Sequence, residues 1–254
     1  MKAIVFVGPT LPPRLRPAED LWDWRPPVRQ GDVYRAALER PAAIGIIDGY
    51  FEVVPTVWHK EILWAMAEGM HVFGAASIGA LRAAELDRFG MRGIGRVYED
   101  FRDGVLQDDD EVAVLHGPEE LGYPQLTEAM VDIRATLDQA VRSGILAEHL
   151  ACQLTAMANS LFYKERSWKA VLAAVADGEV PAAPLCAFIE WLPSGRSDQK
   201  RRDAEAMLDA IRAHCASGAS SLHVSYTLVN AVAWEAARKS VDPLKEGLAK
   251  ERSR

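Results

Sequence analysis

The sequence has few of the residue patterns that mark disulfide-bonded or metal-binding proteins. Its three cysteines, Cys152, Cys186 and Cys215, are widely spaced and form no C-x-x-C pair. An odd number of isolated cysteines does not build a disulfide framework, so we interpret them as reduced core thiols. The six histidines are scattered and none lies in an H-E-x-x-H pattern, so we predict no metal site and no cofactor.

Long apolar runs and an excess of positive charge are also missing. The first apolar run, residues 3–8, is too short for a signal peptide, and no apolar run of about 18 residues follows it. The net charge of −7 does not favour a nucleic-acid partner. We therefore expect a cytoplasmic protein with neither a membrane nor a nucleic-acid partner.

The first half of the chain contains three units in which a short apolar run precedes a helical pattern. We expect strands at 3–8, 42–47 and 71–73 and helices at 33–39, 56–68 and 78–89. Such a succession predicts an α/β fold with a parallel sheet and right-handed crossovers. A further strand is expected at 112–115, and the proline-rich stretch 11–30 is expected to be a loop whose tryptophans either pack on the domain or anchor a partner.

The second half has a helical pattern, and we predict a mainly helical module over 121–254 after an α/β core over 1–120. Its helices are expected at 126–142, 146–161, 167–176, 182–192, 198–215 and 222–238. The charged tail after Asp242 is expected to be disordered. One basic cluster is either a docking patch for an acidic protein or a solvated helix start: Arg196, Lys200, Arg201 and Arg202.

Ser77 lies where the strand at 71–73 passes into the helix at 78–89. Its neighbours Gly74, Ala76 and Gly79 are small, so a substrate could approach the backbone closely. The free N–H groups at a helix start can stabilise a developing oxyanion. This arrangement resembles a nucleophile elbow, although the spacing is A-x-S-x-G. The alternative is that Ser77 is an ordinary helix N-cap.

Lys60 lies in the first turns of the preceding helix, which is apolar on nearly all sides. Burial penalises an ammonium and should depress its pKa, and a neutral lysine can accept the proton of a serine hydroxyl. The alternative is a surface lysine whose stem lies along the helix.

Both residues belong at the same edge of the predicted sheet, beyond the carboxyl ends of its strands, where ligands bind in open α/β folds. Asp48 ends the second strand at this edge and either orients Lys60, binds substrate, or only forms a turn with Gly49. We predict Ser77 and Lys60 as the catalytic pair. The residues expected to contact the substrate are Asp48, Gly49, Gly74, Ala76, Gly79 and Arg82.

Five stretches resemble the core domain of the TfuA family over roughly residues 2–145. They are DGYF (48–51), VWHKEILWAMAEG (57–69), HVFGAASIGALRAAEL (71–86), DDDEVAVLHGP (108–118) and LTEAMVDIRATL (126–137). TfuA proteins accompany YcaO enzymes, which use ATP to activate peptide amides during backbone thioamidation.

The resemblance implies a hydrolase that cleaves the C-terminal thiocarboxylate of a ThiS-like sulfur carrier protein and releases sulfide. A serine–lysine pair is attributed to the family, and the matching residues here are Ser77 and Lys60. The implied partners are the YcaO enzyme, the carrier and, through the complex, the peptide substrate. The alternative function is a non-catalytic adaptor that binds the YcaO enzyme and presents peptide or carrier to it.

Overall fold

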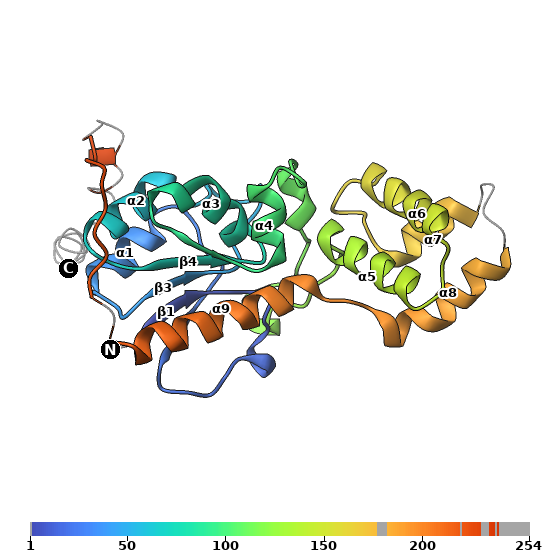
Figure 1. Cartoon of the computed structure of the whole chain (residues 1–254), viewed down its shortest axis with the longest axis horizontal. Helices are drawn as coiled ribbons and strands as arrows, with labels where there is room; N and C mark the ends of the chain where they lie inside the picture. Colours follow the sequence, from blue (N-terminus) through green and yellow to red (C-terminus); the bar gives the residue numbers. More distant parts are fainter. Residues whose placement is uncertain (1, 177–181, 219, 230–233, 237, 239–254) are drawn as a thin grey trace, which may run out of the picture.

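The computed structural model describes residues 2–176, 182–218, 220–229, 234–236 and 238 and contains a five-stranded parallel sheet (Figure 1). The strands are β1 (Ala3–Phe6), β2 (Trp22–Arg25), β3 (Ile44–Ile46), β4 (Val72–Ala75) and β5 (Arg92–Ile94). They lie in the order β2-β1-β3-β4-β5. The predicted α/β fold with a parallel sheet followed by a mainly helical region is therefore confirmed.

The helices of the first half alternate with the strands. They are α1 (Asp32–Leu38), α2 (His59–Ala67), α3 (Ile78–Leu86) and α4 (Arg96–Arg102). Side chains at alternating strand positions, including Ile4, Ile44 and Val72, form one core with these helices. Gly90 ends the 3₁₀ turn that follows α3, with φ +113°, a left-handed conformation that glycine adopts without strain.

The second half forms a separate helical lobe before returning to the sheet (Figure 1). Its helices are α5 (Met130–Arg142), α6 (Glu148–Ser160), α7 (Trp168–Ala176), α8 (Ala182–Gly195) and α9 (Gln199–Ala216). The first four share a core of their own. In contrast, α9 runs back along the sheet, where Met207 and Ile211 pack with Val5 and Phe73 on the face opposite α1–α3. The division at residue 120 stays a prediction, and α9 is a C-terminal helix that completes the sheet's core.

Two strands were not predicted. Residues 22–25, within the stretch expected to be a loop, form β2, and residues 92–94 form β5, both at the edges of the sheet. An edge strand has one neighbour and tolerates charged residues such as Asp23 and Arg92, so neither carries the continuous apolar run of a central strand. Conversely, the predicted strand at 112–115 is wrong, because a 3₁₀ turn, Asp109–Val112, occupies its start and no strand follows.

The helix predicted at 222–238 is wrong over its described first part. Residues 222–229 are not helical, and their burial alternates with a period of two. Leu222 and Val224 pack against the core of the sheet, and the Leu222 N–H donates to the Gly69 carbonyl at 2.8 Å. Alternating apolar and polar residues are typical of an extended segment, so this period was misread as helical. The tail after Asp242 lies outside the described residues.

No helix in the described part of the chain combines the length and the apolar character needed to span a bilayer.

Candidate functional site

Ser77 occupies a tight turn between β4 and α3. The preceding residue, Ala76, has φ +68°, and the Ser77 N–H donates to the Ala75 carbonyl across this turn at 2.7 Å. A non-glycine residue in this region of φ is uncommon and tends to mark a functional turn. Ser77 is the residue at the N-cap position of α3, but its hydroxyl donates elsewhere and does not cap the helix.

Gly74 and Gly79 allow α3 to lie directly on the sheet. A Cβ added at Gly74 would lie 2.1 Å from the Gly79 carbonyl oxygen, and one added at Gly79 would lie 1.8 Å from the Ile46 carbonyl oxygen. Both positions therefore face backbone within the fold, and neither lines the cavity described below. Ala76 is fully buried. That these three residues contact the substrate stays a prediction. In the structure their small size is needed so that α3 and the turn can pack on the sheet.

A cavity of 330 Å³ opens beside Ser77. Its wall is formed by the loop after β3, the start of α3, the segment that follows the 3₁₀ turn, and two residues before α7. The lining residues are Pro9, Asp48, Gly49, Tyr50, Phe51, Val53, Ser77, Ile78, Leu81, Asp109, Val112–Pro118, Tyr163 and Lys164. Residues distant in the sequence therefore meet at the carboxyl edge of the sheet, where the connectivity predicted a site.

Ser77 and Ile78, the first residue of α3, both line this cavity. Ser77 Oγ lies 3.5 Å from the Val112 carbonyl oxygen, to which it donates, and the residue is 8% exposed. The N–H groups of Ser77 and Gly79 donate to the carbonyls of Ala75 and Ile47. The N–H of Ile78 donates to no described residue. An unpartnered N–H directly after the nucleophile is the donor that a nucleophile elbow uses for an oxyanion.

Asp48 lines the cavity, but its carboxylate is already hydrogen-bonded within the protein. Oδ2 accepts the N–H groups of Gly8 and Thr10 at 2.9 and 3.0 Å, and Oδ1 accepts the Thr10 hydroxyl at 2.6 Å. These bonds join the end of β3 to the turn after β1. Gly49 packs against Val28 and Ile78, where a Cβ would lie 2.8 Å from the Ile78 side chain.

Arg82 does not line the cavity. It is 8% exposed, its Nε donates to the Val57 carbonyl at 3.3 Å, and its Nη1 pairs with Glu85 Oε2 at 2.7 Å. His59 Nε2 lies 2.7 Å from the same oxygen. Burial alone would raise the pKa of Glu85. The hydrogen bond with His59 and the charge of Arg82 outweigh burial, so the pKa of Glu85 is lowered. The structure therefore shows Arg82 joining α3 to the start of α2.

Lys60 is half-buried at the second position of α2. It does not line the Ser77 cavity, and it forms no hydrogen bond or ion pair with a residue that the structure describes. Its pairing with Ser77 stays a prediction.

Another lysine, Lys164, lines the cavity but is held by an acid. Its Nζ pairs with Glu52 Oε2 at 3.0 Å, and the Tyr163 hydroxyl donates to the same oxygen at 2.9 Å. The hydrogen bond with Glu52 raises the pKa of Lys164, which keeps the ammonium charged.

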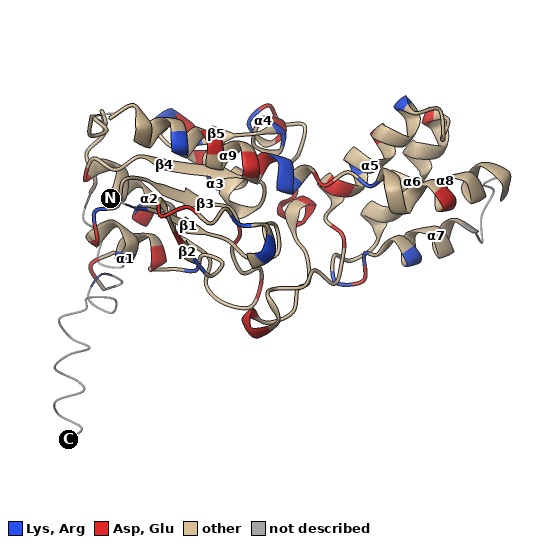
Figure 2. Cartoon of the chain, turned by 90° about the horizontal axis from the view of Figure 1, so that it is seen from below, with Lys and Arg blue, Asp and Glu red and all other residues tan. Residues whose placement is uncertain are grey.

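A third lysine, Lys200, was missed by the sequence reasoning as a site residue. Its Nζ donates to the Val112 carbonyl at 2.8 Å, the same oxygen that accepts from Ser77, and the residue is 2% exposed. Of the two alternatives for the basic cluster, the structure does not favour a docking patch, because Lys200 is buried and Arg196 pairs with Glu128. Figure 2 shows acidic and basic residues interspersed over both lobes. The helical spacing of Lys200 with Ala204, Met207 and Ile211 was the available signal, since it places the lysine on the apolar face of α9.

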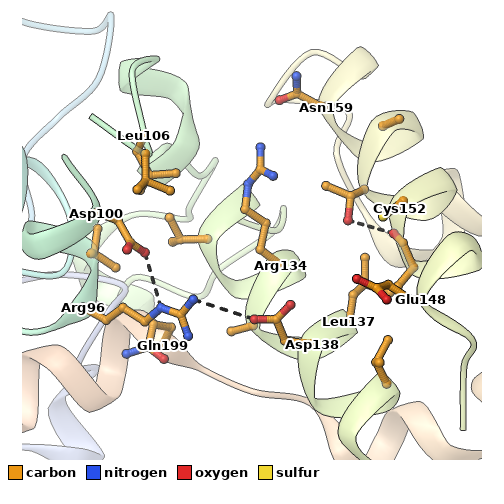
Figure 3. A pocket seen from close by; sticks show the side chains of 18 of the residues that line it. Arg96, Asp100, Leu106, Arg134, Leu137, Asp138, Glu148, Cys152, Asn159 and Gln199 are labelled. Carbon is orange, nitrogen blue, oxygen red and sulfur yellow. Dashed lines mark hydrogen bonds and ion pairs between the residues drawn. The ribbon is translucent and has the colours of Figure 1, made fainter. Parts of the chain in front are cut away.

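A larger groove of 770 Å³ lies between α4 and the helices α5 and α6 (Figure 3). In this groove Arg96 forms ion pairs with Asp100 at 3.4 Å and with Asp138 at 3.8 Å. Cys152 lies at this groove and, like Cys186, is exposed, so the interpretation of these two cysteines as core thiols is wrong. The Ser77 cavity, although smaller, is lined by Ser77, by Ile78, whose N–H has no described partner, and by Val112, whose carbonyl accepts from Lys200.

Comparison with protein-family models matches residues 48–167 to the family described as TfuA-like protein. The matched range contains the loop after β3, Lys60, the Ser77 turn and the segment around Val112. No curated protein matches the sequence.

Proposed function

Because residues 48–167 form a TfuA-like protein family domain, in a family associated with YcaO-dependent thioamidation, we propose that this protein hydrolyses a thiocarboxylate at Ser77. The substrate is the C-terminus of a ThiS-like sulfur carrier protein, and the product is sulfide for a partner YcaO enzyme that acts on a peptide. The observation that carries this proposal is the position of Ser77, which follows Ala76 at φ +68° and directly precedes Ile78, whose N–H donates to no described residue.

The start of α3 suits an anionic substrate. A thiocarboxylate carries a negative charge, which makes its carbonyl carbon a poor electrophile. The N-terminus of a helix offsets such a charge, and the Ile78 N–H can donate to the oxygen on which charge develops. The cavity of 330 Å³ admits a thin C-terminal tail and excludes a folded domain.

The reaction needs a nucleophile and a base. As Ser77 Oγ attacks the thiocarboxylate carbon, its proton passes to a lysine amine. The carbon–sulfur bond then breaks, and the lysine returns the proton to the sulfur, which leaves as hydrosulfide. Water cleaves the acyl-serine ester, producing the carrier carboxylate and the free hydroxyl. Lys60 is the base that the sequence indicates, and it is the first lysine to substitute.

The test uses the purified full chain and thiocarboxylated carrier, followed by intact mass of the carrier and by sulfide release. We expect the wild-type protein to convert thiocarboxylate to carboxylate, and Ser77→Ala to lose this conversion while remaining folded by circular dichroism. Ser160→Ala, which changes an exposed serine, is the matched control and should retain activity. Hydrolysis by neither protein, together with binding of the YcaO enzyme, would favour the adaptor function instead.

A further inference from the structure

We propose that the folded domain of the carrier protein docks on the surface around the opening of the Ser77 cavity, an inference that rests on the proposed function. The cavity holds 330 Å³, which is enough for a thin tail and too little for a folded domain. An extended chain spans at most about 3.6 Å per residue. While the last few residues of the carrier occupy the cavity, its folded domain therefore lies against the residues that surround the opening.

Large apolar side chains are exposed around this opening. Val53 and Leu115 line the cavity, and Val53 is 76% exposed. Phe162 is 51% exposed and contacts Tyr163 of the lining, with 4.8 Å between the ring centroids. Leu126 is also exposed, and its N–H donates to the Leu115 carbonyl at 2.8 Å. We call Val53, Leu115, Leu126 and Phe162 the docking rim, because exposed apolar side chains that gather in one place are typical of a protein interaction surface.

Aromatic contacts join the three chain segments that carry the docking rim. The rings of Tyr50 and His116 lie 6.0 Å apart between centroids, which joins the loop after β3 to the segment of Leu115. The rings of Phe51 and Tyr163 lie 5.2 Å apart, which joins the same loop to the segment of Phe162. The docking rim is therefore formed within the fold, and a partner that binds it has little of this surface left to order.

Acidic side chains near the docking rim indicate the charge of the partner. Asp109 lines the cavity, and Glu119 and Glu120 directly follow Pro118 of the lining. All three acids are exposed, and none forms an ion pair with a residue that the structure describes. Complementary charges favour docking of one partner over another. The carrier is therefore expected to present an apolar patch bordered by lysine or arginine beside its tail.

The larger groove between α4 and the helices α5 and α6 fits this role less well (Figure 3). It shares no lining residue with the Ser77 cavity, so a carrier bound there would not lie at the opening through which its tail must pass. Among the described residues that line it, Val105 is the single large apolar side chain that is exposed. Val105 therefore provides a control for the apolar residues of the docking rim.

The experiment measures binding of the full chain to the carrier in its carboxylate form, which has no sulfur to lose, by isothermal titration calorimetry. We expect Phe162→Ser and Leu126→Ser each to weaken the affinity about tenfold, as removal of an interface anchor does, and Val105→Ser to change it less than about twofold. All three side chains are exposed, so circular dichroism should show each variant folded.

A second comparison tests the acidic border of the docking rim. The wild-type affinity should fall as salt is added, because salt screens exposed charges. The double variant Glu119→Gln, Glu120→Gln should bind more weakly at low salt and should depend less on salt. A salt dependence identical to that of the wild-type protein would contradict the expected basic border of the carrier.

The outcomes separate this inference from the proposed function. Unchanged carrier binding by Phe162→Ser and Leu126→Ser overturns the docking assignment, and weaker binding by Val105→Ser alone places the carrier in the larger groove. Loss of YcaO binding or of self-association in the two rim variants, with carrier binding intact, gives the surface another occupant and also overturns the inference. None of these results depends on hydrolysis, whereas an active Ser77→Ala overturns the proposed function and leaves the binding measurements unchanged.

Discussion

Ser77 and Lys200, which both donate to the Val112 carbonyl, show how differently two neighbouring residues can be predicted. Ser77 lies between an apolar run and a helical pattern, which are local signals, so its place at a strand–helix turn could be predicted and is confirmed. Lys200 approaches Val112 only through the tertiary fold, because α9 returns to the sheet after the whole helical lobe. No local pattern encodes that return, although the apolar face of α9 indicated burial.

A single substitution can test whether Asp48 stabilises the fold or binds the substrate. We expect Asp48→Asn to lower the free energy of unfolding by about 2 kcal/mol, because an amide cannot replace both carboxylate oxygens as acceptors for Gly8 and Thr10. Urea unfolding measures this change, and exposed Asp20→Asn is the control. A variant with unchanged stability and weaker carrier binding would instead assign Asp48 to the substrate.

At the scale of single elements, the placement of α3 depends on Gly79. We expect Gly79→Ala to lower the free energy of unfolding by about 3 kcal/mol or more, because its Cβ would lie 1.8 Å from the Ile46 carbonyl oxygen. The control is Gly144→Ala, which has open space around it and should cost only about 1–2 kcal/mol for its positive φ. Equal effects in chemical denaturation would show that α3 can move away from the sheet at little cost.

Helix α9 covers one face of the sheet, and its contribution can be measured at Ile211. This residue is fully buried and packs with strand residues such as Val5. We expect Ile211→Ala to cost about 2–5 kcal/mol of unfolding free energy, as removal of a buried aliphatic side chain does. Exposed Glu205→Ala on the same helix should change stability by less than about 0.5 kcal/mol. Similar small changes for both would mean that α9 is only loosely attached.

The positions of the buried central elements were predicted better than those of the edge elements. The central strands and α1–α3 have continuous apolar runs or a helical period, and each was located to within a few residues. The edge strands β2 and β5 were missed because each pairs with only one strand. Their sequences therefore mix apolar with charged residues and lack a continuous apolar run. The extended residues 222–229 were assigned to a helix because their period of two was not recognised.

For the whole molecule, the contact between the helical lobe and α9 gives a pH dependence of stability. Burial raises the pKa of Asp132 to about 7, with repulsion from Asp198 adding to the shift and the charge of Lys200 opposing it. An unfolded aspartate titrates near ~3.9, so between these values the folded state binds the extra proton. The stabilising contribution is therefore complete below about pH 4 and is lost as the pH rises through about 7.

Asp132→Asn should remove this dependence, because the amide cannot ionise and its oxygen can still accept the Lys200 N–H. Urea unfolding at about pH 5 and about pH 8 measures it, and we expect the variant to lose less stability than the wild-type protein across this interval. An identical loss in both proteins would mean that Asp132 does not titrate in this range.

The most direct test of the central claim is whether the carrier becomes esterified to Ser77. Wild-type protein and Ser77→Ala are mixed with thiocarboxylated carrier, quenched in acid during the first turnover, and analysed by intact mass and peptide mapping. We predict a wild-type adduct equal to the carrier minus hydrogen sulfide, located on the peptide that contains Ser77, and neither adduct nor sulfide from Ser77→Ala. Sulfide release by folded Ser77→Ala at the wild-type rate would contradict the account.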